Sequence, residues 1–228
     1  MTVPIARVGI VVPAHNEQDW LGRCLAALGR AAAAVPLPVD VVVVADACTD
    51  ATTTVARAAG VDVLDIDARN VGVARRVGWD RLRGDASPSL WLATTDADSL
   101  VPPDWLTRMV GYADEGWDAV AGTIVVRDWA AAGRPDAVRA AWQVNYGRSR
   151  GHVHGANLGV RASRYASAGG VPTRALAEDA GLVAALTADG ARVLTATDVP
   201  VLTSARFSVR AQGGFASYLD DLDEGLGA

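Results

Sequence analysis

The chain has 228 residues, half of them hydrophobic and 21% charged, which is typical of one globular domain with a sizeable core. Its formal net charge is −5 and all 21 basic residues are arginine, so a nucleic-acid-binding protein is not expected. No apolar stretch is long enough to span a bilayer and no signal-peptide pattern is present, so we expect a cytoplasmic protein, with attachment to the inner membrane face as an alternative.

The N-terminal half alternates between strand and helix patterns. Apolar runs, several of them rich in β-branched residues, predict four buried strands, at residues 8–12, 39–45, 61–66 and 89–95. Helical patterns separate the strands, with Asn16 and Asn70 placed to cap two helices and Gly60 placed to end another. This alternation predicts an α/β fold, namely a doubly wound, mostly parallel mixed sheet flanked by helices.

Polar clusters follow three of the predicted strands, at residues 13–17, 46–50 and 96–99. In such sheets ligands bind beyond the carboxyl ends of the strands, so the clusters are expected to share one site. The glycine-rich dinucleotide fingerprint and the Walker loop are missing from the sequence, which disfavours an NAD-dependent or a P-loop enzyme.

Two carboxylates, Asp96 and Asp98, end the fourth predicted strand. In an extended chain alternate side chains share a face, so both carboxylates can point the same way and repel each other. A divalent cation such as Mg²⁺ would relieve that repulsion. The alternatives are a solvated Asp-rich turn and a phosphatase-type Asp nucleophile.

The C-terminal half has less regular patterns. A helix is expected after Pro102-Pro103, a strand at 118–126 and a helix at 135–149, whose Trp142 and Tyr146 are expected to pack in the core. A strand-like run ends at Arg161, and a further helix through Leu182 and Leu186 precedes a strand at 199–203. The acidic tail from residue 220 is expected to be frayed, and no linker divides the chain, so residues 1–228 are expected to form one domain.

Taken in order, the clusters resemble the motifs of glycosyltransferase family 2, whose members have the GT-A fold. The matching motifs are residues 11–17 (Val-Val-Pro-Ala-His-Asn-Glu), Asp46 with Thr49-Asp50, Asn70-Val-Gly72 with Arg75 and Arg76, Asp96-Ala-Asp98, residues 155–161 (Gly-Ala-Asn-Leu-Gly-Val-Arg) and Glu178-Asp179. The resemblance extends over residues 8–215, and it implies a metal-dependent transferase that moves one sugar from a nucleotide-sugar donor, preferably a UDP-sugar, to an acceptor hydroxyl.

For the donor, the resemblance implies a nucleotide-binding half at residues 8–99. The loop after Val12 and the Asp46 carboxylate would hold the base and ribose, Glu17 the ribose, and Asp98 an Mg²⁺ or Mn²⁺ ion on the diphosphate. Asp96 would lie nearer the ribose or a metal-bound water, with His154 as a third candidate ligand. The implied donor residues are Pro13, Ala14, His15, Glu17, Asp46, Arg75, Arg76, Asp96, Ala97 and Asp98. The alternative for Glu17 is an acid favoured at a helix N-terminus, and that for Asp50 is a helix cap.

For the acceptor, the resemblance implies a half at residues 100–215 that binds a small molecule, a glycan or a lipid-linked acceptor. Asp179 would deprotonate the attacking hydroxyl, although both acids of its pair could merely begin a helix. The implied acceptor residues are His154, Gly155, Ala156, Asn157 and Glu178. Arg206 and Arg210 lie in residues 204–215, which either close over the diphosphate or form an ordinary connection.

Three alternatives to an inverting transferase stay open at this point. The first is a retaining transferase of the glucosyl-phosphoglycerate synthase kind. The others are a nucleotidyltransferase and a binding module without catalysis. The Gln-x-x-Arg-Trp signature of processive synthases is missing, which favours a single sugar transfer.

Overall fold

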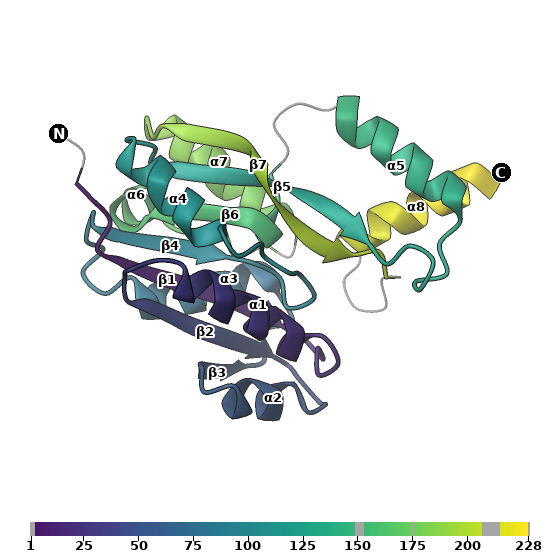
Figure 1. Ribbon diagram of the computed structural model, residues 1–228, viewed down its shortest axis with the longest axis horizontal. Coiled ribbons are helices and arrows are strands. Elements are labelled where there is room, and N and C mark those ends of the chain that lie inside the picture. Colours follow the sequence, from purple (N-terminus) through teal and green to yellow (C-terminus); the bar gives the residue numbers. More distant parts are fainter. Residues whose placement is uncertain (1–2, 149–152, 175, 207–214, 228) are drawn as a thin grey trace.

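The computed structural model describes residues 3–148, 153–174, 176–206 and 215–227 (Figure 1). Its sheet has seven strands in the order β3-β2-β1-β4-β6-β5-β7. Their bounds are Arg7–Ala14 (β1), Val39–Asp46 (β2), Asp62–Ile66 (β3), Leu90–Thr94 (β4), Ala119–Arg127 (β5), Leu158–Arg161 (β6) and Val193–Ser204 (β7). The expected α/β doubly wound sheet is confirmed.

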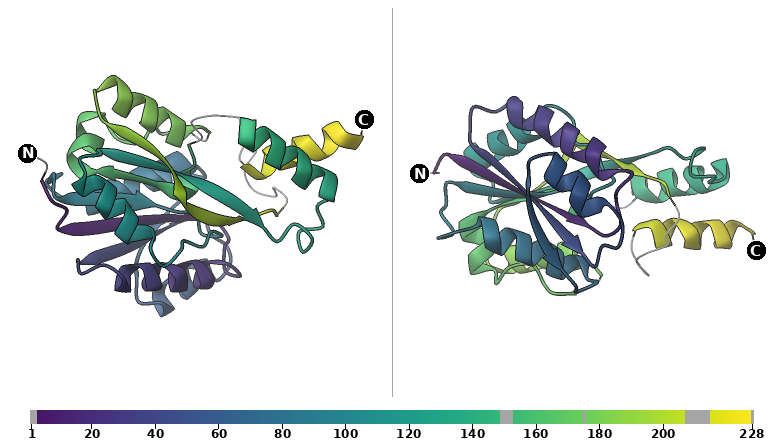
Figure 2. Two further views of the ribbon diagram at one scale, coloured as in Figure 1. Left: turned by 45° about the horizontal axis from the view of Figure 1, so that its top comes forward. Right: turned by 90° about the horizontal axis from the view of Figure 1, so that it is seen from below.

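Helices cover both faces of this sheet (Figure 2). Helices α1 (Leu21–Ala33), α2 (Thr52–Ala58) and α4 (Trp105–Asp114) pack on one face, whereas α3 (Val71–Leu82), α6 (Ala162–Ser167) and α7 (Glu178–Ala188) pack on the other. Strand β1 supplies both cores, because Ile10 faces the first group of helices and Val11 the second. Burial of each such side chain stabilises the fold by about 1.5–3 kcal/mol.

Strand β6 makes the sheet mixed. It runs antiparallel to both of its neighbours, β4 and β5, while every other strand pair is parallel. Gly159 of β6 lies against the indole of Trp91, where a Cβ atom would approach to 2.5 Å. Strands β1, β2 and β4 are parallel to one another, so their carboxyl ends meet at one edge of the sheet.

Helices α5 (Asp136–Arg148) and α8 (Phe215–Gly227) extend beyond the ends of β5 and β7, at the right of Figure 1. They pack together around a separate apolar cluster that includes Val138, Trp142 and Leu219. The expected core role of Trp142 is thus confirmed. The expectation of a frayed tail from residue 220 is wrong, because α8 covers most of that segment and its Leu222 packs against this cluster.

Two helix starts test the capping predictions. Asn70 caps α3 as expected, since its side chain accepts a hydrogen bond of 3.1 Å from the Val73 N–H. The cap at Asn16 is wrong, because α1 begins only at Leu21 and the Asn16 side chain instead accepts from the Thr49 N–H (2.7 Å). Among the described residues no helix has the length and apolar character required to cross a bilayer.

Candidate active site

The carboxyl edge of the sheet gathers five carboxylates and two arginines. The acids are Glu17 after β1, Asp96 and Asp98 after β4, and Glu178 and Asp179 at the start of α7. Arg75 of α3 and Arg206 after β7 lie among them. With every acid ionised the cluster carries a net charge of −3 (two positive charges against five negative), so it favours an additional cation.

Arg206 pairs with two of the acids. Its Nη1 donates to Glu17 Oε2 (2.7 Å), its Nη2 also contacts the other Glu17 oxygen, and Nη2 lies 3.1 Å from Asp98 Oδ2. Burial raises the pKa of Asp98 to about 6, opposed by the charge of Arg206 and reinforced by those of Asp96 and Glu17. Asp98 is therefore a carboxylate whose negative charge is incompletely compensated.

Arg75 joins the two halves of the chain. Its guanidinium donates to Asp96 Oδ1 (2.5 Å) and pairs with Glu178, and the side chains of Arg75 and Glu178 are only 5% and 6% exposed. Burial raises the pKa of Glu178, and the charge of Arg75 opposes that shift. The glycine at position 155 is required by this guanidinium, which a Cβ atom at Gly155 would meet at 2.2 Å.

Asp179 differs from its neighbour in the acidic pair. Its Oδ2 accepts a hydrogen bond from the Gly155 N–H (2.7 Å) and its Oδ1 accepts one from the Ala180 N–H (2.7 Å). It is half-buried, whereas Glu178 is buried and held by Arg75. Asp179 is thus the acid of this pair that an incoming hydroxyl group can reach.

Asp46 makes contacts that the sequence did not indicate. It is buried, and its two oxygens accept hydrogen bonds from the N–H groups of Ala68, Arg69 and Asn70 (2.7, 2.8 and 2.7 Å). The Asp46 carbonyl lies 2.6 Å from His15 Nδ1. The geometry therefore favours a role in shaping the loop before α3 over direct contact of the carboxylate with a nucleotide base.

Three of the other predicted donor residues have apolar side chains and lie at the same edge, where the Ala14 carbonyl accepts a hydrogen bond from Cys48 Sγ (3.3 Å). Pro13 and Ala14 are buried as the last residues of β1, and Ala97 is buried between Asp96 and Asp98. Asp50 accepts a hydrogen bond of 2.9 Å from the N–H of Thr52, the first residue of α2, which favours the structural alternative for that carboxylate.

Two of the predicted acceptor residues are buried in the frame of the site. The Asn157 side chain is completely buried, accepts from Trp105 Nε1 (2.8 Å) and donates to the carbonyls of Thr123 and Val199 (both 2.9 Å). Ala156 packs in the apolar cluster near α5. These contacts join β5, β7 and α4, so they favour a structural role for Asn157, and its place at the acceptor stays a prediction.

Three more residues were predicted at the site, namely His154, Arg76 and Arg210. His154 Nε2 lies 3.1 Å from the hydroxyl of Tyr146, whose ring stacks on the imidazole. Arg76 donates to the Val171 carbonyl (3.1 Å) and lies 3.6 Å from Asp80, not among the carboxylates of the site. Arg210 lies outside the described residues.

Two features of the site were missed by sequence reasoning. Buried Arg134 donates to the carbonyls of Ala205 (2.6 Å) and Arg206 (3.1 Å) and so fixes the backbone that carries the Arg206 guanidinium. Trp20 contacts two guanidinium groups, those of Arg23 and Arg127, which lie 5.9 and 5.5 Å from its ring centre. The contact of Arg127 with Trp20 had one indication in the sequence. Alternate residues of a strand share a face, so Arg127 is expected on the same face of β5 as Val125.

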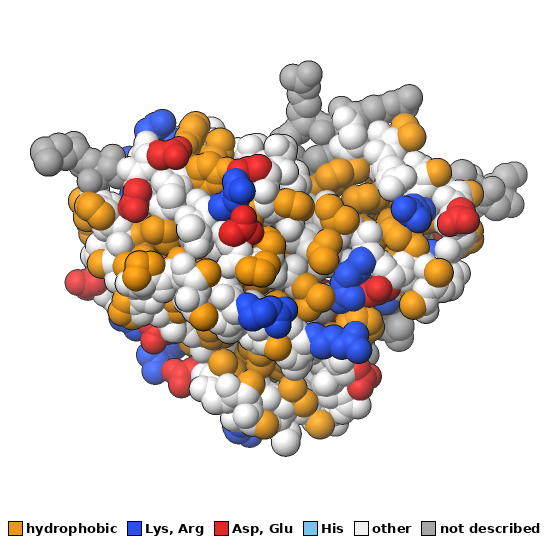
Figure 3. All heavy atoms as spheres, viewed as in Figure 1, with side chains coloured by type: hydrophobic (Ala, Val, Ile, Leu, Met, Phe, Trp, Pro, Cys, Tyr) orange, Lys and Arg blue, Asp and Glu red, His pale blue; other side chains and the backbone are white. Residues whose placement is uncertain are grey.

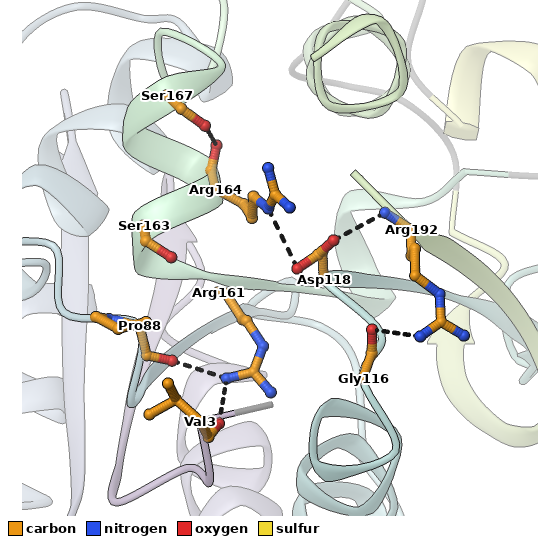
Figure 4. Close-up of a pocket in the computed structure, with 9 residues that line it drawn as sticks. All are labelled: Val3, Pro88, Gly116, Asp118, Arg161, Ser163, Arg164, Ser167 and Arg192. Atoms are coloured by element: carbon orange, nitrogen blue, oxygen red, sulfur yellow. Dashed lines mark hydrogen bonds and ion pairs between the residues drawn. The ribbon is translucent and has the colours of Figure 1, made fainter. Parts of the chain in front are cut away.

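A pocket of about 540 Å³ lies at the opposite edge of the sheet (Figure 4). Its arginines already have partners: Arg161 donates to the carbonyls of Val3 (2.8 Å) and Pro88 (2.7 Å), and Arg164 pairs with Asp118 (3.2 Å). The Asp118 carboxylate also accepts from the N–H of Arg192 (2.9 Å). The polar residues that line this pocket thus hold neighbouring segments together, and the pocket lies away from the carboxylate cluster.

The cluster fits a cation that is shared with a ligand. In the described part of the chain no three His, Cys, Asp or Glu side chains gather closely enough to hold a metal ion by themselves. Mg²⁺, however, is commonly held by one or two carboxylates together with substrate phosphates. Asp98, with its incompletely compensated charge, is the side chain that fits this arrangement best.

Sequence comparisons agree with the motifs. The family model described as "Glycosyl transferase family 2" matches residues 9–167. An undecaprenyl-phosphate 4-deoxy-4-formamido-L-arabinose transferase of Klebsiella pneumoniae is 33% identical over 128 residues, and that of Yersinia pestis is 31% identical over the same length. These matches cover 53% of this chain and 37% of each relative, so the chain matches little more than a third of the relatives' length.

Solved structures show the same fold. TarS 1-349 of S. aureus in complex with UDP-GlcNAc has a TM-score of 0.68 at 15% identity, over 92% of this chain and 61% of that one. The mannosyltransferase PcManGT of Pyrobaculum calidifontis, in complex with GDP-Man and Mn²⁺, has a TM-score of 0.64 at 22% identity, with the same coverage. Glucosyl-3-phosphoglycerate synthase of Mycobacterium tuberculosis has a TM-score of 0.57 at 18% identity, over 86% of this chain and 70% of that one. The expected GT-A fold is confirmed by these similarities.

Proposed function

Because the chain belongs to glycosyl transferase family 2, we propose that it transfers one sugar from a nucleotide-sugar donor, preferably a UDP-sugar, to an acceptor hydroxyl. The observation that carries the proposal is the cluster of five carboxylates and two arginines at the carboxyl edge of the sheet. The complexes of similar folds with UDP-GlcNAc and with GDP-Man and Mn²⁺ support a nucleotide-sugar donor.

On the donor side, Asp98 is the proposed ligand of Mg²⁺ or Mn²⁺. When bound, the cation supplies Lewis-acid stabilisation of the negative charge that grows on the departing nucleoside diphosphate. Asp96 is drawn toward Arg75, which favours a role nearer the ribose or a water molecule for that carboxylate. Arg206, which pairs with Asp98, is the residue proposed to contact the diphosphate.

On the acceptor side, we assign the general base to Asp179. Arg75 holds Glu178 in the interior, so Glu178 acts as a positioning residue at the junction between residues 8–99 and 100–215. Asp179 then takes the proton of the hydroxyl as its oxygen attacks the anomeric carbon and the bond to the diphosphate breaks. A single displacement of this kind inverts the anomeric configuration.

The acceptor is proposed to be lipid-linked, which would place the protein at the inner face of a membrane. Val125 and Leu202 are paired across β5 and β7 and are 43% and 39% exposed. Arg127 lies two residues from Val125, on the same face of β5; its side chain is 18% exposed, pairs with Asp128 and reaches the ring of Trp20. Figure 3 shows hydrophobic side chains over these outer strand segments with arginines beside them, a combination that suits an anionic membrane surface.

The direct test is a thermal-shift screen of UDP, GDP and the corresponding nucleotide sugars, with and without Mn²⁺. A ligand that binds only the folded state raises the melting temperature. We expect a nucleoside diphosphate to stabilise the protein in the presence of Mn²⁺, and transfer to release that diphosphate. Release of pyrophosphate would instead identify a nucleotidyltransferase, and no stabilisation by any nucleotide would contradict the donor site.

A further inference from the structure

Arg206 lies beside Asp98, the residue proposed to bind the metal ion. Its guanidinium spans Glu17 and Asp98, which come from the loops after β1 and β4 and lie 189 and 108 positions away in the sequence. The side chains of Glu17 and Asp98 are only 9% and 15% exposed, so little water shields their charges. Among the described residues, Arg206 is the cation that pairs with the proposed metal ligand.

The backbone of Arg206 is fixed, whereas its side chain has room to turn. Arg134 holds the carbonyls of Ala205 and Arg206 and is itself tied to Asp220 of α8 by a contact of 2.6 Å. The Arg206 side chain is 29% exposed, so one side of it faces solvent. Rotation about its side-chain bonds can therefore free both carboxylates without moving the strand.

We propose that Arg206 is an exchangeable counter-cation, which pairs with Glu17 and Asp98 in the free protein and transfers to the diphosphate when a divalent cation and a nucleotide bind together. This inference rests on the proposed function. It adds that the free protein excludes the metal through one of its own side chains, so metal and nucleotide bind cooperatively.

The physical reason is that two cations compete for Asp98. An ion bound to Asp98 Oδ2 at about 2.1 Å would lie within roughly 5 Å of the guanidinium nitrogen, where like charges in a partly buried site repel strongly. The diphosphate offers Arg206 a new anionic partner of matching geometry, and the metal then replaces the arginine at Asp98. Each ligand thus removes an obstacle to the other, and the coupling is reciprocal.

The test is Mn²⁺ binding to the whole chain, measured by the electron paramagnetic resonance signal of free Mn²⁺. Titrations are run without nucleotide and with saturating UDP or GDP, whichever stabilises the protein. The variants are Arg206→Gln, Arg206→Lys and the matched control Arg57→Gln, whose arginine forms an exposed pair with Asp65. Circular dichroism confirms that each variant is folded.

We expect Arg206→Gln to bind Mn²⁺ about tenfold more tightly in the absence of nucleotide, and the nucleotide to improve Mn²⁺ binding about tenfold less than in the wild type. Arg206→Lys keeps the positive charge but loses the planar guanidinium that spans two carboxylates. Its Mn²⁺ affinity without nucleotide, and the effect of the nucleotide on that affinity, should lie between those of the wild type and Arg206→Gln. Arg57→Gln should match the wild type.

An unchanged or weaker affinity of Arg206→Gln for Mn²⁺ alone would overturn the inference and leave the proposed function standing. If Arg206→Gln does not fold, an Mn²⁺ affinity of Arg206→Lys equal to that of the wild type overturns it in the same way. A different result would contradict the proposed function. If the wild type binds no nucleoside diphosphate in the presence of Mn²⁺, both the proposed function and this inference are wrong.

Discussion

The guanidinium of Arg75, on helix α3, donates a hydrogen bond of 2.5 Å to the carboxylate of Asp96 at the end of strand β4. The same guanidinium pairs with Glu178, so one buried cation joins the proposed donor and acceptor sides. Asp98 pairs with Arg206 instead. The two acids of the Asp-Ala-Asp motif therefore have different partners, which supports different roles for them.

Replacement of Arg75 should destabilise the fold. Arg75→Met leaves Glu178 buried without its partner, and breaking a buried ion pair in this way costs about 3–5 kcal/mol in the free energy of unfolding. Urea unfolding followed by circular dichroism measures the change. Arg57→Met removes only an exposed pair and should cost no more than about 1 kcal/mol. The double variant Arg75→Met/Glu178→Met should recover part of the loss, and a single variant as stable as the wild type would contradict the role of Arg75.

Asp98 and Asp96 should differ in their effect on metal binding. Asp98→Asn is expected to abolish the Mn²⁺-dependent increase in melting temperature caused by a nucleoside diphosphate, because it removes the proposed ligand. Asp96→Asn is expected to reduce that increase only partly, since Asp96 is engaged with Arg75. Calorimetric titration of the nucleotide with and without Mn²⁺ gives the affinities. Equal losses in the two variants would contradict the division of roles.

The pKa of Asp98 predicts a pH-dependent stability. It is raised from 3.8 to about 6, so the folded protein binds this proton more tightly than the unfolded chain does. The stabilisation from the proton is fully present below about pH 4 and is lost as the pH rises through about 6. With metal removed by a chelator, the advantage of Asp98→Asn over the wild type in free energy of unfolding should grow by about 1–3 kcal/mol between pH 4 and pH 7. A difference that does not change with pH would show that Asp98 titrates normally.

Asp179 should be required for transfer but not for donor binding. Asp179→Asn removes the proposed base, and general-base catalysis contributes about 10²–10⁴-fold, so kcat should fall by that factor. The affinity for the nucleotide with Mn²⁺ should stay within about twofold, because the carboxylate acts on the acceptor side. NMR of the product supplies an independent check, since a product that keeps the donor's anomeric configuration would exclude the base role and favour the retaining alternative.

The exposed pair on β5 and β7 should mediate membrane binding. Val125→Ser/Leu202→Ser removes apolar area next to Arg127, so co-sedimentation with anionic phospholipid vesicles should fall severalfold. Val144→Ser, an equally exposed valine on helix α5, is the matched control and should bind vesicles like the wild type. Loss of binding in the control alone would place the membrane contact on α5, and no binding by the wild type would exclude a membrane role for this face.

The sequence by itself determined the class of fold and the edge at which the site lies. Continuous apolar runs such as residues 8–12 and the capped helix at Asn70 are local patterns, and local patterns encode strands, helices and their order. Because successive parallel strands end at the same edge, the polar residues that follow them could be assigned to one site from the order of the elements alone. The six short motifs, taken in order, added the resemblance to the family.

Only the tertiary structure decided which side chains meet. Arg75 and Glu178 are 103 positions apart, and Glu17 and Arg206 are 189 apart, so no local periodicity encodes their pairing. The same reason explains the error at α8, which has the pattern of a frayed tail unless α5 provides an apolar partner. It also explains why the contacts of the Asn157 amide with Trp105 and two carbonyls could not be predicted from the sequence. Partner choice among buried charges depends on packing and desolvation, which arise only when distant segments come together.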